Sequence, residues 1–298
     1  MDFSQVKTPG NTNEITRAYL DNLLIESRYI DSVVPDTSMQ LYGKTFASPI
    51  MIAAFSHLGG WYPNGMVEMA NAAKNAGICN WAGMGDEAEL GEVLATGAAT
   101  IKIVKPYADR SWIYNRLQHA YQNGALAVGI DIDHSFNKAG QQDVVNGLVM
   151  NPLTLQELRD FVQATPLPFV VKGVLSVSDA LKCKEAGVKG ILVSHHHGIA
   201  PCGVPPLMIL PKIRAAVGDD MDIFVDCSID NGMDAFKALA LGADAVCVGR
   251  AVLEPFKKTG AAGAEEYLKT MHDQLRSTMA RTGATCLADI SPDVIWNT

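Results

Sequence analysis

One repeating unit dominates this chain from residue 48 onward: an apolar segment of strand length, a polar turn, an amphipathic helical segment and a glycine. Such alternation is typical of α/β proteins with a parallel sheet. Eight segments have the composition of buried strands, at residues 48–54, 78–82, 100–104, 126–132, 169–172, 190–194, 222–226 and 245–249. A glycine that tolerates positive φ at a helix end stands just before five of them: Gly77, Gly97, Gly124, Gly187 and Gly242.

Eight strand-helix units without a linker predict a closed (β/α)8 TIM barrel, with residues 1–298 as one domain. An open doubly wound sheet is disfavoured, because no strand-to-helix turn carries a Gly-x-Gly-x-x-Gly motif. We expect barrel helices at residues 63–75, 87–95, 110–122, 154–162, 177–185, 206–217, 232–241 and 264–281. An N-terminal extension over residues 1–46 is expected to cap the barrel with a helix at 13–28, whose apolar side holds Leu20, Leu23, Leu24 and Tyr29.

Composition narrows the class of ligand. The chain has 298 residues, 48% of them hydrophobic, and a net charge of −8 without a basic stripe. Nucleic acids and anionic membranes need clustered Lys and Arg, so a small soluble ligand is the better expectation. Six cysteines without a Cys-x-x-Cys pair predict free thiols, with Cys202 in an exposed loop. No apolar run reaches signal-peptide or membrane-span length, which predicts a cytoplasmic protein.

Polar side chains gather where the predicted strands end. The sixth strand runs into Ser194, His195, His196 and His197, and the carboxyl ends of barrel strands are where catalytic groups collect. The same edge should display Ser56, His57, Asp131, Asp133, His134, Lys172, Asp226, Ser228, Gly249 and Arg250. The long polar connection at residues 133–152 is expected to act as a lid. Residues 226–232 and 245–250 predict a phosphate site, with small residues, backbone N–H groups and Arg250 as its charge partner.

The motifs on the later strands identify a family. They are Val171-Lys172-Gly173, the stretch 190–194, Phe-Lys-Ala-Leu-Ala-Leu-Gly-Ala at 236–243 and Val248-Gly249-Arg250. With them, the chain from about residue 13 to 283 resembles the FMN-dependent 2-hydroxy-acid dehydrogenases and oxidases, which include glycolate oxidase, lactate oxidase and flavocytochrome b2. The resemblance implies an FMN-binding barrel and a homo-oligomer, specifically a tetramer.

The resemblance also implies roles for matching residues. Lys172 would stabilise the reduced flavin ring, Ser194 would bind near the ring, and Asp226 would orient a catalytic histidine. The remaining cofactor contacts would come from Ala54, Phe55, Ser56, Gly83, Asp131, Ser228, Gly249 and Arg250.

The catalytic base of this family is a histidine in a Ser-Asn-His-Gly motif, which is Ser-His-His-His-Gly here. Counting from Ser194 without a gap assigns the base to His196, whereas matching the His-Gly pair assigns it to His197. We favour His196, because this register also aligns Gly203-Val204-Pro205, and because strand alternation would place His196 on the side of Ser194.

The substrate side departs from the family. The arginine expected three residues after the base is Ile199 or Ala200, and no arginine follows Asp133. The strand-3 motif is Lys-Ile-Val-Lys at 102–105, and Asp230 replaces a phosphate arginine. We therefore expect an atypical substrate, bound by Lys105, His134 and His195.

The leading hypothesis is an FMN-dependent oxidoreductase that acts on a CH–OH group, with no metal in its reaction. A metal-dependent lyase or isomerase is the alternative, using Asp131, Asp133, His134, His195 and His197 as carboxylate and imidazole ligands. A flavin-binding barrel that has lost its chemistry is a third possibility, and the gain of imidazoles speaks against it.

Overall fold

Eight parallel strands form the centre of the computed structural model, which describes residues 2–296. In chain order they are β4 (Ile50–Ile52), β5 (Asn80–Ala82), β6 (Thr100–Val104), β7 (Ala127–Asp131), β10 (Phe169–Val174), β11 (Gly190–Val193), β12 (Asp222–Val225) and β13 (Ala245–Val248). From β5 to β13 each strand pairs with the next one in this order, and β13 pairs with β4. Between β4 and β5, the N–H of Ile52 donates to the Cys79 carbonyl at 3.0 Å, which brings the two edges together. The predicted (β/α)8 barrel is confirmed.

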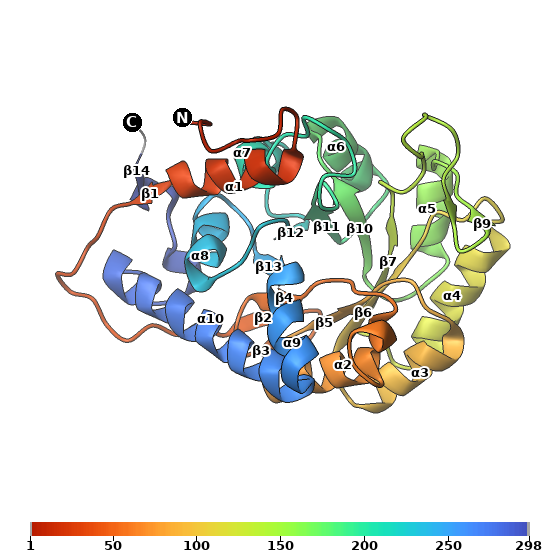
Figure 1. Ribbon diagram of the computed structural model, residues 1–298, viewed down its shortest axis with the longest axis horizontal. Coiled ribbons are helices and arrows are strands. Elements are labelled where there is room, and N and C mark those ends of the chain that lie inside the picture. The colour runs from red at the N-terminus through yellow and green to blue at the C-terminus, as the bar shows by residue number, and fades with distance from the viewer. Residues whose placement is uncertain (1, 297–298) are drawn as a thin grey trace.

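Helices surround the strands (Figure 1). They are α2 (Gly65–Asn75), α3 (Glu87–Ala95), α4 (Ser111–Gln122), α5 (Leu155–Gln163), α6 (Val177–Glu185), α7 (Pro206–Val217), α8 (Gly232–Ala240), α9 (Leu253–Thr259) and α10 (Ala261–Thr282). Short 3-10 turns lie at Leu58–Gly60, Arg250–Val252, Leu287–Asp289 and Pro292–Val294. The five glycines predicted to precede strands all have positive φ, between 66° and 109°, which a side chain would strain.

Two apolar layers hold the barrel together. The inner layer fills the barrel with side chains that include Met51, Trp81 and Phe224, and the Trp81 and Phe224 rings meet edge to face at 5.3 Å. The outer layer lies between strands and helices. Burial on both faces explains why the strand segments read as continuous apolar runs.

The N-terminal extension reaches both ends of the barrel. Its hairpin of β2 (Met39–Leu41) and β3 (Lys44–Phe46) adds Met39, Leu41 and Phe46 to the inner apolar layer. Its helix α1 (Thr12–Asn22) lies at the opposite end, where the hydroxyl of Thr12 donates to the Ala200 carbonyl at 2.7 Å.

The predicted helix at 13–28 is too long. The chain leaves α1 at Leu23 in an extended conformation, and β1 (Leu24–Ile25) then pairs with β14 (Ile295–Trp296). As a result, Leu24 and Tyr29 are 56% and 62% exposed instead of packing on the barrel. Residues that we expected to be helical pair instead with a strand from the far end of the chain. No local sequence pattern could indicate this partner.

The largest departure from the regular pattern is the connection after β7. It carries a hairpin of β8 (Val144–Val145) and β9 (Leu148–Val149). The Asn146 amide at its tip lies 3.3 Å from His57 Nε2, on the connection after β4. No helix within residues 2–296 is long and apolar enough to cross a membrane.

Candidate active site

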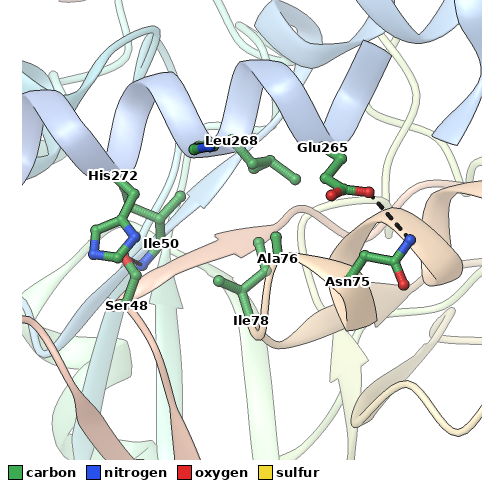
Figure 2. A pocket seen from close by; sticks show the side chains of 9 residues that line it. Ser48, Ile50, Asn75, Ala76, Ile78, Glu265, Leu268 and His272 are labelled. Carbon is green, nitrogen blue, oxygen red and sulfur yellow. Dashed lines mark hydrogen bonds between the residues drawn. The ribbon is translucent and has the colours of Figure 1, made fainter. Parts of the chain in front are cut away.

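A cleft of about 460 Å³ opens at the carboxyl ends of the strands, within the size range of small-molecule sites. Its lining includes many of the predicted site residues: Ala54, Phe55, Ser56, Lys172, His196, His197, Asp226, Ser228, Gly249 and Arg250. A smaller cavity of about 200 Å³ lies between α10 and the beginning of β4 and is lined by residues such as Ser48, Ile50 and His272 (Figure 2). None of the predicted site residues reaches that second cavity.

The three consecutive imidazoles have three different environments. Strand β11 ends at Val193, and the hydroxyl of Ser194 then accepts a hydrogen bond from the His196 N–H at 3.0 Å. His196 and His197 both adopt left-handed backbone conformations, with φ of 46° and 57°. This turn brings the His196 ring into the cluster of charges described below and leaves His197 exposed at the rim of the cleft.

His195 faces away from the cleft and is 3% exposed. Its Nδ1 accepts the Gly198 N–H at 2.9 Å, so Nε2 carries the ring proton and donates to the Thr16 hydroxyl at 2.9 Å. Burial lowers the pKa of His195. The expectation that His195 binds substrate is therefore wrong. Its imidazole instead fixes the turn after β11 to helix α1.

A buried cluster of charges lies beside His196. The Lys172 ammonium is 2.8 Å from His196 Nδ1, 3.4 Å from Asp131 Oδ2 and 3.8 Å from Asp133 Oδ2. A second ammonium, that of Lys105, contacts Asp131 Oδ2 at 2.8 Å. Burial alone would raise the pKa of Asp131, but the two ammonium groups hold it well below its usual range.

Asp133 is the carboxylate that holds the His196 ring. Its Oδ1 lies 2.6 Å from His196 Nδ1, and Asp131 Oδ2 is 3.5 Å from the same nitrogen. Burial and the Lys172 charge lower the pKa of His196, but the two carboxylates outweigh them and raise it above its ordinary value. Burial, opposed by Lys172 and helped by the Asp131 charge, raises the pKa of Asp133 to about 6.

The contact expected between Asp226 and the catalytic histidine is not made. Asp226 lines the cleft and accepts a hydrogen bond from the Cys227 thiol at 2.9 Å, but it bonds to no imidazole among residues 2–296. The end of β12 is on the Lys172 side of the site, and the charge of Asp226 helps to raise the pKa of Lys172. Sequence reasoning placed Asp133 at the correct edge but did not give it this role.

His134 also contacts His196. The two Nε2 atoms are 3.3 Å apart, the ring centroids are 4.4 Å apart and the rings are nearly perpendicular. His134 Nδ1 lies 3.1 Å from Asp143 Oδ2 on the same connection. Asp133, His134 and His196 place ligand atoms within 4.8 Å of one another, so these three residues can hold a metal ion.

Lys102 is a buried lysine near the cleft that the sequence analysis named only as a departure from the family motif. It is 3% exposed in β6, and its only hydrogen-bond partner among residues 2–296 is the Gly83 carbonyl. Burial lowers the pKa of Lys102 to about 8. Gly83 lies so close to the 54–56 segment that a side chain at this position would come within 2.6 Å of the Ser56 hydroxyl. The sequence signal that could have drawn attention to Lys102 is a lysine inside the apolar run of β6.

The predicted phosphate end of the cleft has one cation without an ion pair within residues 2–296, Arg250. Cys227 and Ser228 both have positive φ. Arg17 of α1, which sequence reasoning missed, donates to the Ser228 carbonyl at 3.1 Å and bidentately to Asp234. Asp230 lies 3.7 Å from Arg17, and burial together with the Asp234 charge raises the pKa of Asp230.

Comparison with known proteins identifies the family. The model of the family described as FMN-dependent dehydrogenase matches residues 4–154 and 137–297. The chain belongs to this family. It is 29% identical to L-lactate oxidase of Alicycliphilus denitrificans over 87% of this chain and 80% of that protein. It is also 29% identical to glycolate oxidase 3 of Arabidopsis thaliana, over 90% of this chain and 84% of that protein.

A solved structure agrees with this assignment. A mandelate oxidase variant with an FMN adduct superposes with a TM-score of 0.86 at 26% identity, over 94% of this chain and 90% of that one. The protein is an FMN-dependent oxidoreductase of the 2-hydroxy-acid oxidase family, as the sequence motifs predicted.

The alternative of a metal-dependent lyase is not supported by family membership or by geometry. Asp131 is bound by two ammonium groups, His195 faces α1, and His197 is exposed. The ligand set proposed for that reaction is therefore not assembled.

The cleft fits FMN at both of its ends. Arg250 offers a guanidinium to a phosphate, and the buried Lys172 ammonium lines the other end, where negative charge on a reduced ring would need it. Between these ends the cleft is lined by the backbone of residues 53–56 and by Gly249, where a side chain would meet nothing within 4 Å. The donor set and the space therefore suit a long ligand with an anionic end.

Proposed function

We propose that this oxidoreductase converts a secondary alcohol into a carbonyl compound, with His196 as the catalytic base. The proposal rests on one arrangement: the His196 imidazole lies at the cleft, held by Asp133 at 2.6 Å and beside the Lys172 ammonium at 2.8 Å. FMN, when bound, accepts the hydrogen and electrons that leave the carbinol carbon. The proton transfer and the stabilisation of charge are assigned to residues of this chain.

His196 would take the hydroxyl proton at Nε2, because Nδ1 faces Asp133 and can donate to it. The ring then becomes an imidazolium, and the Asp133 carboxylate offsets its charge. Lys172 contributes a fixed positive charge at the cleft wall, where Asp131 and Asp133 keep it protonated by raising its pKa. Such a positioned base typically contributes about 10²–10⁴-fold to rate.

The substrate is proposed to be uncharged at its reacting end. The cations near His196 are already paired, since Lys105 and Lys172 both contact Asp131. Ile199 and Ala200, which follow the histidines, offer no guanidinium. A carboxylate buried without a cationic partner is poorly held. The substrate is therefore still proposed to be atypical, but Lys105 and His195 are not free to bind it.

One related structure supports a neutral ligand. A mandelate oxidase variant with one arginine replaced by leucine was solved with 2-hydroxy-phenylacetamide, and its structure has a TM-score of 0.86 at 25% identity. That structure thus pairs the loss of an arginine with an amide. We propose 2-hydroxy amides and esters, and bulkier alcohols whose charge lies far from the hydroxyl, as the substrate class.

Further predictions concern the oligomeric state, the location, the domain organisation and a lid. We propose a homo-oligomer, a tetramer by family resemblance, located in the cytoplasm. We also propose that residues 1–298 fold as one domain and that the connection at 133–152 acts as a lid over the cleft.

The visible spectrum of the purified protein tests the cofactor assignment. The protein should be yellow, and denaturation should release FMN into the supernatant, because no covalent link is proposed. A colourless protein that neither binds added FMN nor is thermally stabilised by it would contradict the proposal.

A further inference from the structure

The Nε2 atoms of His134 and His196 lie close together, in two rings that meet edge to face. One ring comes from the connection after β7 and the other from the turn after β11, yet the nitrogens are 3.3 Å apart. Each ring also turns its Nδ1 to a carboxylate, His196 to Asp133 at 2.6 Å and His134 to Asp143 at 3.1 Å.

These contacts constrain the ring protons. An ionised carboxylate only accepts hydrogen bonds, so His134 Nδ1 carries a proton and donates it to Asp143. His196 Nδ1 lies between Asp133 at 2.6 Å, to which it can donate, and the Lys172 ammonium at 2.8 Å, which can only donate. His134 Nε2 is then a bare acceptor in the neutral ring, and His196 Nε2 is bare in the tautomer that donates from Nδ1 to Asp133. In that tautomer a proton or a metal cation bound by both nitrogens would relieve the repulsion of two lone pairs whose nitrogens are 3.3 Å apart.

The separation matches two ligands on one metal ion. Zinc–nitrogen bonds of about 2.0–2.1 Å at a tetrahedral angle place two ligand nitrogens roughly 3.3–3.4 Å apart. Metal-bound histidines usually donate their other N–H to a carboxylate, as His134 does here and His196 can. In addition, Asp133 Oδ2 is buried and has no hydrogen-bond partner within residues 2–296. Asp133 also offers one carboxylate oxygen to the group of ligand atoms that lie within 4.8 Å of one another.

The nearby charges also suit a cation. Three carboxylates, those of Asp131, Asp133 and Asp143, surround the pair, against the two ammonium groups of Lys105 and Lys172. The three carboxylates exceed the two ammonium groups by one negative charge, and Asp143, which contacts neither ammonium group within residues 2–296, is left to offset the charge of an ion.

We propose that His134 and His196 together bind one divalent transition-metal ion, of which Zn²⁺ is the probe. The ion would use the Nε2 atom that the proposed function assigns to proton transfer, so it would inhibit oxidation by masking the base. This consequence rests on the proposed function, whereas metal binding itself does not. The ion is an inhibitory ligand here and takes no part in a lyase reaction.

Zn²⁺ binding to the cofactor-free protein tests the site. Titration calorimetry in a Cys202→Ser background, which removes an exposed thiol, should give one Zn²⁺ per chain. His134→Gln and His196→Gln should each weaken binding at least about 10-fold, and Asp143→Asn about 10–100-fold through loss of the outer carboxylate. His197→Gln is the matched control and should bind as the parent does, because His197 is adjacent and exposed but outside the pair. Far-UV circular dichroism would verify that the variants are folded.

Two results would overturn the site: no Zn²⁺ binding by the parent, as expected if a shared proton joins the rings, or undiminished binding by both His134→Gln and Asp143→Asn. Flavin reduction by the FMN-loaded protein gives a separate readout. Zn²⁺ should slow it in the parent and a chelator should restore it, while His134→Gln should be insensitive. Zn²⁺ that binds through this pair without slowing reduction would leave the metal site intact and contradict the assignment of His196 as the base.

Discussion

Asp133 Oδ1 lies 2.6 Å from His196 Nδ1 and so takes the place that sequence reasoning gave to Asp226. The carboxylates raise the pKa of His196, and the base must be neutral to accept a proton. Flavin reduction should therefore increase with pH through a midpoint above 6.5, the ordinary histidine value. Asp133→Asn should move the midpoint to lower pH and slow the plateau rate about 10–100-fold, because the imidazolium loses its counter-charge.

Anaerobic reduction rates measured across pH would check this prediction. Asp226→Asn is the comparison variant, because Asp226 lines the same cleft without touching the ring. Its midpoint should move less than that of Asp133→Asn. Equal shifts in the two variants would mean that the effect comes from net charge and not from the contact with Asp133.

Single substitutions distinguish the two candidate bases. His196→Ala should keep FMN bound but slow flavin reduction at least ~100-fold, the usual effect of a positioned base. His197→Ala should change the rate much less, since the His197 side chain is exposed and lies outside the charge cluster. Rapid-mixing absorbance of the flavin measures both. An inactive His197→Ala with an active His196→Ala would reverse the assignment.

Much of the barrel could be predicted because its signals are local. Burial on both faces produces apolar runs, and the helix ends need residues with positive φ, as at Gly77 and Gly242. The predicted bounds of α3, α6 and α7 coincide with those observed. Leu24 and Tyr29 were misjudged because the competing partner of β1 lies at the other end of the chain.

The site was predicted less well, because its contacts depend on where chains turn after the strands. The alternation argument for His196 fails in detail, since β11 ends at Val193 and the histidines lie in a left-handed turn. His195 was expected at the substrate, but its ring bonds to Thr16 in α1, 179 residues away. The identity of the residues at the edge followed from the sequence, whereas the pairing of Asp133 with His196 needed coordinates.

Arg250 lines the cleft and should contribute to FMN affinity through its guanidinium, which has no charged partner within residues 2–296. Arg250→Ala should weaken FMN binding by about 1–3 kcal/mol, the cost of a lost charge-assisted hydrogen bond. Asp230→Asn should act in the opposite direction, strengthening binding about 2–5-fold by removing an exposed negative charge from the same end of the cleft. Fluorescence titration of the cofactor-free protein with FMN measures both. Unchanged affinity in Arg250→Ala would place the phosphate elsewhere.

Lys102 should reduce the stability of the cofactor-free protein. Its pKa in the folded state is about 8, below the unfolded value of 10.5, so the unfolded chain binds the proton more tightly. Stability from this group is therefore lost as the pH falls through that window. Lys102→Met should raise the free energy of unfolding at pH 7 by about 1–3 kcal/mol, and the gain should shrink toward pH 10. Urea unfolding at both pH values is the measurement, and a gain independent of pH would point to packing instead of charge.

The central claim is that a base held by Asp133 works in a cleft without a free cation for the substrate carboxylate. Anaerobic stopped-flow reduction of the bound flavin by mandelate and by its amide, 2-hydroxy-phenylacetamide, tests it most directly. The amide should reduce the flavin at least ~10-fold faster than the acid, since burying an unpaired carboxylate costs more than burying an amide. Fast, saturating reduction by mandelate, with the amide slower, would show that another group in the chain binds the carboxylate and would contradict the account.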